Sequence, residues 1–76
     1  MRKKLTEFLA VRGFEHGLVA QSLVGAGFSQ FLRDVSDATS LHPRCVRFIL
    51  NDFCFHGLCT FDPVGRACIS PACAFM

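Results

Sequence analysis

Two arginines and an asparagine recur at helical spacing in segment 43–56, and their side chains suit hydrogen bonding to nucleic acid. Arg44, Arg47 and Asn51 project from one side of this segment if it is helical. A guanidinium can donate two parallel hydrogen bonds to a guanine edge or a phosphate, and a carboxamide pairs in the same way with adenine. His42, just before the segment, is placed to reach a phosphate. The pattern predicts a base-reading surface on one helix face.

The opposite side of the same segment is apolar, which indicates how the helix packs. Its apolar residues fall at positions i, i+3, i+4 and i+7, namely Val46, Ile49, Leu50 and Phe53. Pro43 suits the first helical turn, where a missing N–H leaves no hydrogen bond unmade. Phe48 falls on the outward side with the arginines. We therefore expect a helix over 43–56 with a packed face and an exposed face.

Two further helices are expected upstream. Segment 12–26 predicts the first, and segment 29–39 predicts the second, with Ser29 as its N-cap. Their inward-facing residues are expected to be Phe14, Leu18, Val19 and Leu23 in the first helix, and Leu32 and Val35 in the second. The turn around Ser40 has the length that sets two helices near a right angle in DNA-binding helix-turn-helix units. Residues 1–10 are expected to form a basic arm or a helix extension.

A β-hairpin is expected after the third helix. Gly57 ends the helix, and segment 58–70 holds two short apolar runs around the turn Asp62-Pro63-Val64-Gly65. Arg66 then lies beside the hairpin tip. Three helices followed by a hairpin predict a mostly α fold with a small β-hairpin, the three-helix winged helix-turn-helix. One such domain is expected over residues 1–76.

The chain resembles the N-terminal DNA-binding domain of IclR-type bacterial transcription regulators over residues 11–71. The matching segments are 11–18, 34–41 and 46–50, followed by Gly57-Leu58, Asp62 and Gly65-Arg66. The resemblance implies a regulator of transcription that binds double-stranded DNA, with the third helix in the major groove and the wing on the backbone. The side chains expected to contact DNA are those of His42, Arg44, Arg47, Asn51 and Arg66.

The sequence departs from this family at Ser40, at Phe48 and in the return strand of the hairpin, which is about one residue short and has Cys68 near where the family has an aromatic residue. Ser40 stands where the family usually has a glycine, the residue that adopts a positive φ without strain. Phe48 stands where the family typically has an arginine, so an apolar ring replaces one phosphate or base contact. The family's effector-binding domain has no counterpart here, so we expect no small-molecule effector and no cofactor. A homodimer is kept open because the family binds DNA as dimers.

Charge and hydropathy limit the classes to which the protein can belong. The net charge of +2 permits nucleic-acid binding, and residues 2–4 form a short basic run. The apolar residues that follow are too few for a signal peptide, and Glu7 interrupts them. The longest mostly apolar stretch, residues 18–32, is too short and too polar to span a membrane. These features predict a cytoplasmic protein without a membrane partner.

Five cysteines leave a second interpretation open. No C-x-x-C pair is present, although close pairs are usual in structural zinc sites. A metal site is therefore not expected. If one formed, its ligands would be Cys54, Cys59, Cys68 and Cys73, and His56 could replace one of them. The alternative function is a metal- or redox-responsive winged-helix accessory protein.

A third interpretation starts from the phenylalanines. Phe48 and Phe55 have no obvious place in a three-helix core, so the chain can also be a protein-interaction fragment that no longer binds DNA. Enzyme activity is not expected, because no nucleophile elbow, phosphate-binding glycine loop or paired zincin histidines occur.

Overall fold

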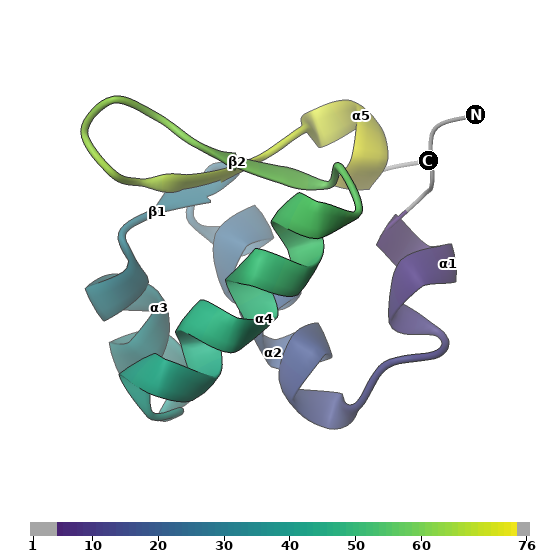
Figure 1. Ribbon diagram of the computed structural model, residues 1–76, viewed down its shortest axis with the longest axis horizontal. Helices are drawn as coiled ribbons and strands as arrows, with labels where there is room; N and C mark the ends of the chain where they lie inside the picture. Colours follow the sequence, from purple (N-terminus) through teal and green to yellow (C-terminus); the bar gives the residue numbers. More distant parts are fainter. Residues whose placement is uncertain (1–4, 75–76) are drawn as a thin grey trace.

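The computed structural model describes residues 5–74, with the backbone alone for residues 73 and 74. Within that range the chain forms helices and three short strands (Figure 1). In chain order they are α1 (Leu5–Leu9), α2 (Phe14–Gly25), β1 (Ser29–Gln30), α3 (Leu32–Thr39), α4 (Pro43–Phe55), β2 (Cys59–Phe61), β3 (Ala67–Ile69) and α5 (Pro71–Ala74). The predicted combination of a mostly helical chain and a small β-hairpin is confirmed.

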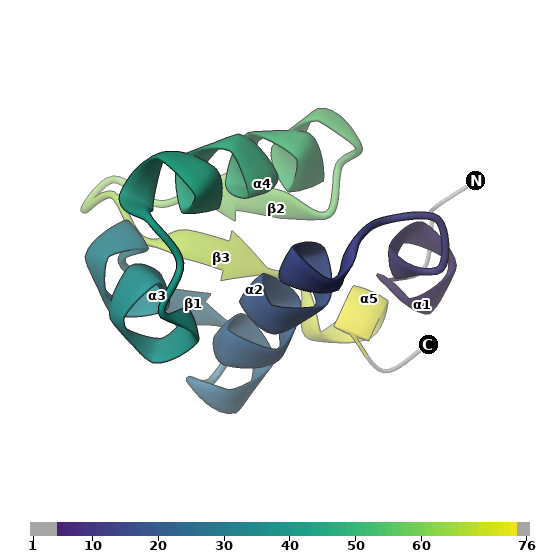
Figure 2. The ribbon, with the colours of Figure 1, turned by 90° about the horizontal axis from the view of Figure 1, so that it is seen from below.

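Three helices enclose most of the hydrophobic core. α3 packs against both α2 and α4, and α2 also contacts α4. The sheet lies across these helices, with β3 against α2 and β2 against α4. Figures 1 and 2 show α1 and α5 together at the end of the molecule farthest from α3.

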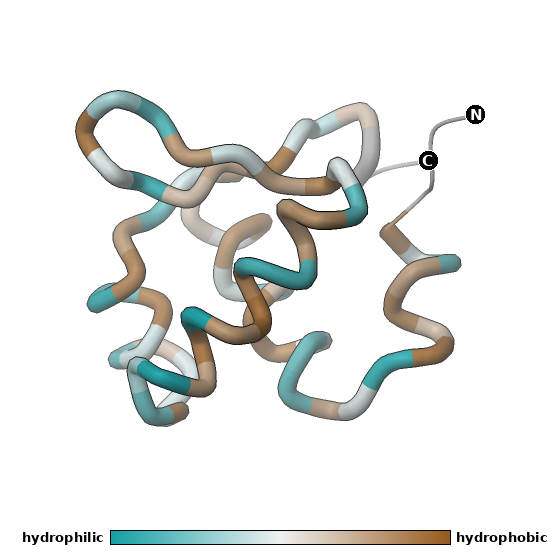
Figure 3. Tube along the Cα trace, viewed as in Figure 1, coloured by the Kyte–Doolittle hydropathy of each residue, from teal (hydrophilic) through white to brown (hydrophobic). Residues whose placement is uncertain are grey.

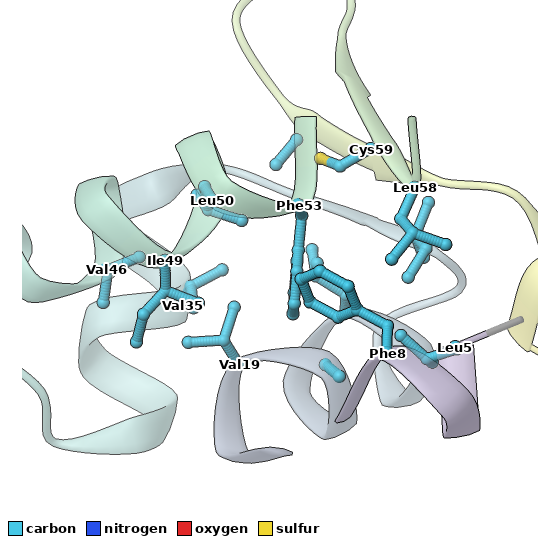
Figure 4. Packing of buried hydrophobic residues seen from close by; sticks show 14 residues of the cluster. Leu5, Phe8, Val19, Val35, Val46, Ile49, Leu50, Phe53, Leu58 and Cys59 are labelled. Atoms are coloured by element: carbon cyan, nitrogen blue, oxygen red, sulfur yellow. The ribbon is translucent and has the colours of Figure 1, made fainter. Parts of the chain in front are cut away.

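Two phenylalanines from distant parts of the sequence meet in the core. Phe8 of α1 and Phe53 of α4 are fully buried and lie edge to face, with ring centroids 5.2 Å apart (Figure 4). The other fully buried large side chains come from α2, α3 and α4 and are Leu23, Ile49, Leu50, Val19, Val35 and Val46. Burial of this apolar surface is the main favourable term in folding, so α1 is an integral part of the fold.

α4 follows the sequence pattern from its N-cap to Phe53. Its stripe of Val46, Ile49, Leu50 and Phe53 is buried, as predicted. His42 is the N-cap, and its Nδ1 accepts a hydrogen bond from the backbone N–H of Arg44 at 3.0 Å. Pro43 occupies the first turn. The cap and the stripe together fix where the helix begins and which way its polar face points.

The C-terminal end of α4 is set by a glycine. Gly57 has a φ of 77°, a left-handed conformation that costs glycine little. The N–H of Leu58 donates to the carbonyl of Phe53 at 2.9 Å, and the N–H of Gly57 donates to that of Cys54 at 3.0 Å. This is the Schellman arrangement. It reverses the chain within two residues, so the hairpin starts directly beside the helix that precedes it.

The turn between α3 and α4 comprises residues 40–42. Ser40 has a φ of 61° and a ψ of 22°, so a non-glycine residue adopts the left-handed conformation here. The Thr39 hydroxyl donates to the carbonyl of Val35 at 2.6 Å and accepts from the N–H of Leu41 at 3.4 Å. Leu41 packs against the edge of the core.

The sheet has three antiparallel strands in the order β1-β3-β2. Cys68 in the central strand stands opposite Ser29 on one side and Thr60 on the other. The hairpin predicted over 58–70 is therefore confirmed as β2 and β3, whereas β1 is an additional strand. It ties the hairpin to the segment between α2 and α3.

This additional strand corrects the predicted start of the second helix. The sequence predicts a helix over 29–39 capped by Ser29, but α3 begins at Leu32. Ser29 is committed to the sheet, so its backbone cannot also open a helix. The N-cap is instead Phe31, whose extended backbone has a ψ of 151° and whose side chain makes no capping hydrogen bond.

The predictions for the N-terminal third also need correction. α2 spans Phe14–Gly25 rather than 12–26, because Gly13 is extended. Phe14, predicted to point inward, is 77% exposed because it occupies the first position of the helix and projects away from the core. Residues 5–9 form α1, which packs Leu5 and Phe8 inward and is more than a basic arm. Residues 1–4, the basic run itself, lie outside the described residues.

Candidate nucleic-acid interface

One ridge of α4 faces away from the rest of the protein. Arg44, Phe48, Asn51 and Phe55 follow each other at helical spacing, and all four are exposed. They lie opposite the buried stripe, and Figure 3 shows hydrophilic and hydrophobic residues alternating along this helix. The four side chains predicted to face outward, those of Arg44, Arg47, Phe48 and Asn51, are all exposed. The ridge is therefore free to contact a partner.

Arg47 lies on the flank of α4 that faces the hairpin. It lines one open hollow with Pro43 and Arg44, and a second with Asn51 and Phe61. Leu32 at the start of α3 and Gly65 at the hairpin turn complete the second hollow. Side chains from α3, α4 and the hairpin thus meet around Arg47, so the ridge and the hairpin form one continuous surface.

His42 has a structural role that fixes its ring. Because Nδ1 accepts the hydrogen bond from the N–H of Arg44, the neutral ring carries its proton on Nε2. The side chain is exposed at the N-terminus of α4. It can therefore cap the helix and still donate to an external acceptor through Nε2.

Arg66 lies on the hairpin but is not free of internal partners. Its Nε donates to Asp62 Oδ2 at 3.0 Å, and its guanidinium carbon is 5.9 Å from the centroid of the Phe31 ring. The side chain remains 46% exposed. The ion pair reduces the charge that Arg66 presents, but it also holds the guanidinium beside the hairpin turn.

Asp62 organises the hairpin turn itself. Its Oδ1 accepts hydrogen bonds from the N–H groups of Val64, Gly65 and Arg66 at 3.0, 2.9 and 2.8 Å. The hydrogen bond from the Arg66 backbone is the main reason that the pKa of Asp62 lies below its ordinary value of 3.8, and the Arg66 guanidinium and the Gly65 N–H lower it further. The turn is therefore closed by an ionised carboxylate, which also fixes the position of Arg66.

All five predicted contact residues are exposed, although they divide into two groups. Arg44, Arg47 and Asn51 are neighbours on α4, with His42 just before them, whereas Arg66 reaches the surface from the hairpin. Of the two hollows that Arg47 lines among the described residues, one includes Arg44 and the other Asn51, and Arg66 lines neither. The surface that they share would have to follow an extended ligand rather than enclose a small one.

A second polar cluster, which sequence reasoning missed, lies on the opposite flank of α4. Asp52 accepts hydrogen bonds from Arg12 Nε at 3.0 Å and lies 2.9 Å from His16 Nε2. Arg12 Nη2 is also 3.0 Å from His56 Nε2, and its guanidinium lies 3.8 Å above the Phe8 ring. The hydrogen bond from Arg12 is the main reason that the pKa of Asp52 is lowered from 3.8.

The cluster joins α1, α2 and α4 with the loop that carries Arg12, rather than forming a cleft. Its side chains are 14–30% exposed, which leaves little room for a substrate. The only sequence signal for it was the helical position of Asp52 and His56, four residues apart. The contacts of Arg12 and His16 with Asp52 could not be predicted from sequence spacing, because more than 35 residues separate each of them from Asp52.

The cysteines are arranged less favourably for a metal than their number indicates. Cys59 is buried, and burial raises the pKa of its thiol to about 12, which disfavours the thiolate that a metal needs. Cys54 and Cys68 are half-buried free thiols. The side chain of Cys73 lies outside the described residues. Within residues 5–72, no group of three or more histidine, cysteine or carboxylate side chains is placed to hold a metal ion.

Comparison with family models, curated proteins and solved structures finds no significant match to this chain. The helices of the described region also include none with the length and apolar character needed to cross a lipid bilayer.

Proposed function

We propose that this protein is a DNA-binding module of the winged helix-turn-helix type, as in IclR-type regulators of transcription. The order of the elements supports this proposal: α3, a three-residue turn and α4 are followed by a β-hairpin. The hairpin also pairs with the short strand β1. The observation that carries it is the surface around Arg47. There Arg47 and Asn51 of α4 border the same hollow as Phe61 and Gly65 of the hairpin.

In this proposal α4 enters the major groove of double-stranded DNA. Arg44 and Asn51 lie seven residues apart, which is about 10 Å along a helix and matches the rise of roughly three base pairs. Arg44 and Arg47 donate to guanine edges or phosphates, and Asn51 pairs with adenine. His42 donates from Nε2 to a phosphate at the N-terminus of the helix, where the helix dipole also favours an anion.

The hairpin supplies the second contact. Arg66, held beside the turn by Asp62, contacts the backbone or the adjacent minor groove. Pairing with Asp62 is not an obstacle, because an exposed ion pair contributes little and a phosphate can replace the carboxylate. Its expected role is to add affinity that does not depend on sequence.

Fluorescence anisotropy with a short labelled duplex of mixed sequence, at low and moderate salt, tests the proposal. The wild-type protein is expected to bind, with affinity falling steeply as salt rises. Arg66→Ala should weaken binding to all duplexes evenly and reduce the salt slope by about one. Arg47→Ala should remove about 1–3 kcal/mol of discrimination between sequences.

A charge-matched control separates the effect of losing Arg47 at this site from the effect of lowering the net charge of the protein. Gln21→Glu lowers the net charge by one unit, as Arg47→Ala does, but it lies on the exposed side of α2. Gln21→Glu should leave binding almost unchanged. Equal loss for Gln21→Glu and Arg47→Ala, or no salt-dependent binding by the wild type, would contradict the proposal.

A further inference from the structure

Phe48 is exposed in the middle of the proposed reading surface. Its side chain is 70% exposed. Among the side chains of residues 5–72, no aromatic ring or guanidinium packs against the ring of Phe48. An exposed phenylalanine forgoes the free energy that its burial would contribute. Its position between Arg44 and Asn51 on the ridge makes the ring available to an external apolar partner.

The neighbours of Phe48 restrict what that partner can be. Phe48 follows Arg44 by four residues and precedes Asn51 by three, which places it about 6 Å and 4.5 Å from them along the helix axis. A base contacted by Phe48 would thus lie between the bases contacted by these two side chains. It would be one or two base pairs from each.

The major groove offers an apolar ring one specific partner. Base edges there present hydrogen-bond donors and acceptors, and the C5-methyl group of thymine is the apolar feature among them. A phenylalanine cannot satisfy the polar edges of guanine, adenine or cytosine. It can cover a methyl group and exclude water from it.

We propose that Phe48 determines sequence specificity by packing against the C5-methyl group of a pyrimidine, which is thymine in unmodified DNA. The proposal rests on the proposed function, because it assumes that α4 lies in the major groove. It assigns a reading role to the position where the resembling family typically has an arginine. The preferred site then contains a methyl-bearing pyrimidine between the bases read by Arg44 and Asn51.

The test removes the methyl group without changing the sequence. A duplex library with a random core is enriched by binding to the wild-type protein, and the enriched pool is copied with either thymidine or deoxyuridine triphosphate. Loss of one buried methyl group corresponds to about a fourfold loss of affinity. We expect the wild type to bind the uracil pool about fourfold more weakly, and Phe48→Ala to bind both pools equally.

Phe14→Ala is the matched control, since Phe14 is 77% exposed but lies on α2. This variant should retain the wild-type preference for thymine. Equal wild-type binding to both pools, or a preference that survives in Phe48→Ala, would overturn the inference and leave the proposed function intact. Failure of the wild type to enrich or bind any duplex would overturn both.

Single duplexes then identify the source of the methyl group. They are varied at the one thymine whose replacement weakens binding. The first comparison is thymine against uracil, each paired with adenine. The second is 5-methylcytosine against cytosine, each paired with guanine. Both methylated bases should be preferred over their unmethylated partners, because the methyl group occupies the same place in the groove. The methylated pair that binds more tightly identifies the natural ligand, and no methyl preference in either comparison would contradict the contact.

Discussion

Arg12 and Asp52 are joined by two hydrogen bonds, from Nε to Oδ2 at 3.0 Å and from Nη2 to Oδ1 at 3.4 Å. Arg12 lies in the loop after α1, and Asp52 lies in the last turn of α4. The same guanidinium lies 3.8 Å above the ring of Phe8. A polar link and an apolar contact therefore anchor the N-terminal segment to the helix that carries the proposed reading surface.

Asp52→Asn should lower the free energy of unfolding by about 1–3 kcal/mol, because it leaves Arg12 with a weaker partner in a half-buried place. Asp37→Asn removes an exposed carboxylate of α3 and should change stability by no more than about 0.5 kcal/mol. Urea unfolding followed by circular dichroism measures both, because the chain has no tryptophan to report by fluorescence. Equal stabilities for the two variants would show that the link contributes nothing.

The Asp52 contribution should depend on pH in a defined direction. The hydrogen bond from Arg12 holds the pKa of Asp52 below 3.8 in the folded state. A carboxylate with a lowered folded-state pKa stabilises the protein above its unfolded value and loses this effect as pH falls through the folded value. The stability difference between wild type and Asp52→Asn should therefore be full above about pH 5 and shrink below pH 4. A difference that grows on acidification would contradict this assignment.

Phe8→Ala should destabilise the protein by about 3–5 kcal/mol, because Phe8 is fully buried against Phe53 and its loss leaves a cavity. For a small domain this approaches the whole free energy of unfolding. Phe55→Ala removes an equally large ring that is 85% exposed and should change stability by about 0.5 kcal/mol or less. Thermal unfolding monitored by circular dichroism compares the two. A mild effect of Phe8→Ala would mean that α1 is not part of the core.

Ser40→Gly should stabilise the protein by about 1 kcal/mol. Ser40 has a φ of 61°, a left-handed conformation that costs a residue with a Cβ more than it costs glycine. Ser70→Gly is the control, since Ser70 has no positive φ and glycine there only increases the entropy of the unfolded chain. Urea midpoints should rise for the first variant and fall slightly for the second. A fall for both would show that the left-handed turn is not strained.

Asp62→Ala should loosen the hairpin turn while leaving the helices intact. It removes the acceptor for the N–H groups of Val64, Gly65 and Arg66, so their hydrogen exchange should become faster. In the wild type, the amide shifts of these residues should titrate with a midpoint below 3.8, because hydrogen bonds from Arg66 and Gly65 lower the pKa of Asp62. A midpoint at or above that value, or unchanged exchange in the variant, would count against the turn geometry.

Much of the helical framework was predictable because local patterns determine it. The stripe from Val46 to Phe53 and the breaker at Gly57 are contained in one short segment, and α4 follows them closely. Ser29 shows the limit of local reasoning. Its side chain suits an N-cap, but its backbone pairs with Cys68, nearly forty residues later, and that pairing leaves no local signal.

The candidate site was predictable to the same degree. Exposure of Arg44, Arg47 and Asn51 follows from helical spacing alone. The ion pair that restrains Arg66, and the hollow that brings Phe61 beside Arg47, depend on how the hairpin folds back over α3. Spacing along the sequence carries no information on such contacts.

The most direct test is a proton–nitrogen NMR titration of the labelled protein with a duplex from the enriched pool. The proposed function predicts dispersed signals and shifts concentrated in residues 42–51 and 62–67, with the amides of α1 and of the exposed side of α2 unmoved. These shifts should diminish as salt is added. A folded protein whose spectrum does not change when the duplex is added, or whose shifts centre on α1 and α2, would contradict DNA binding by α4 and the hairpin.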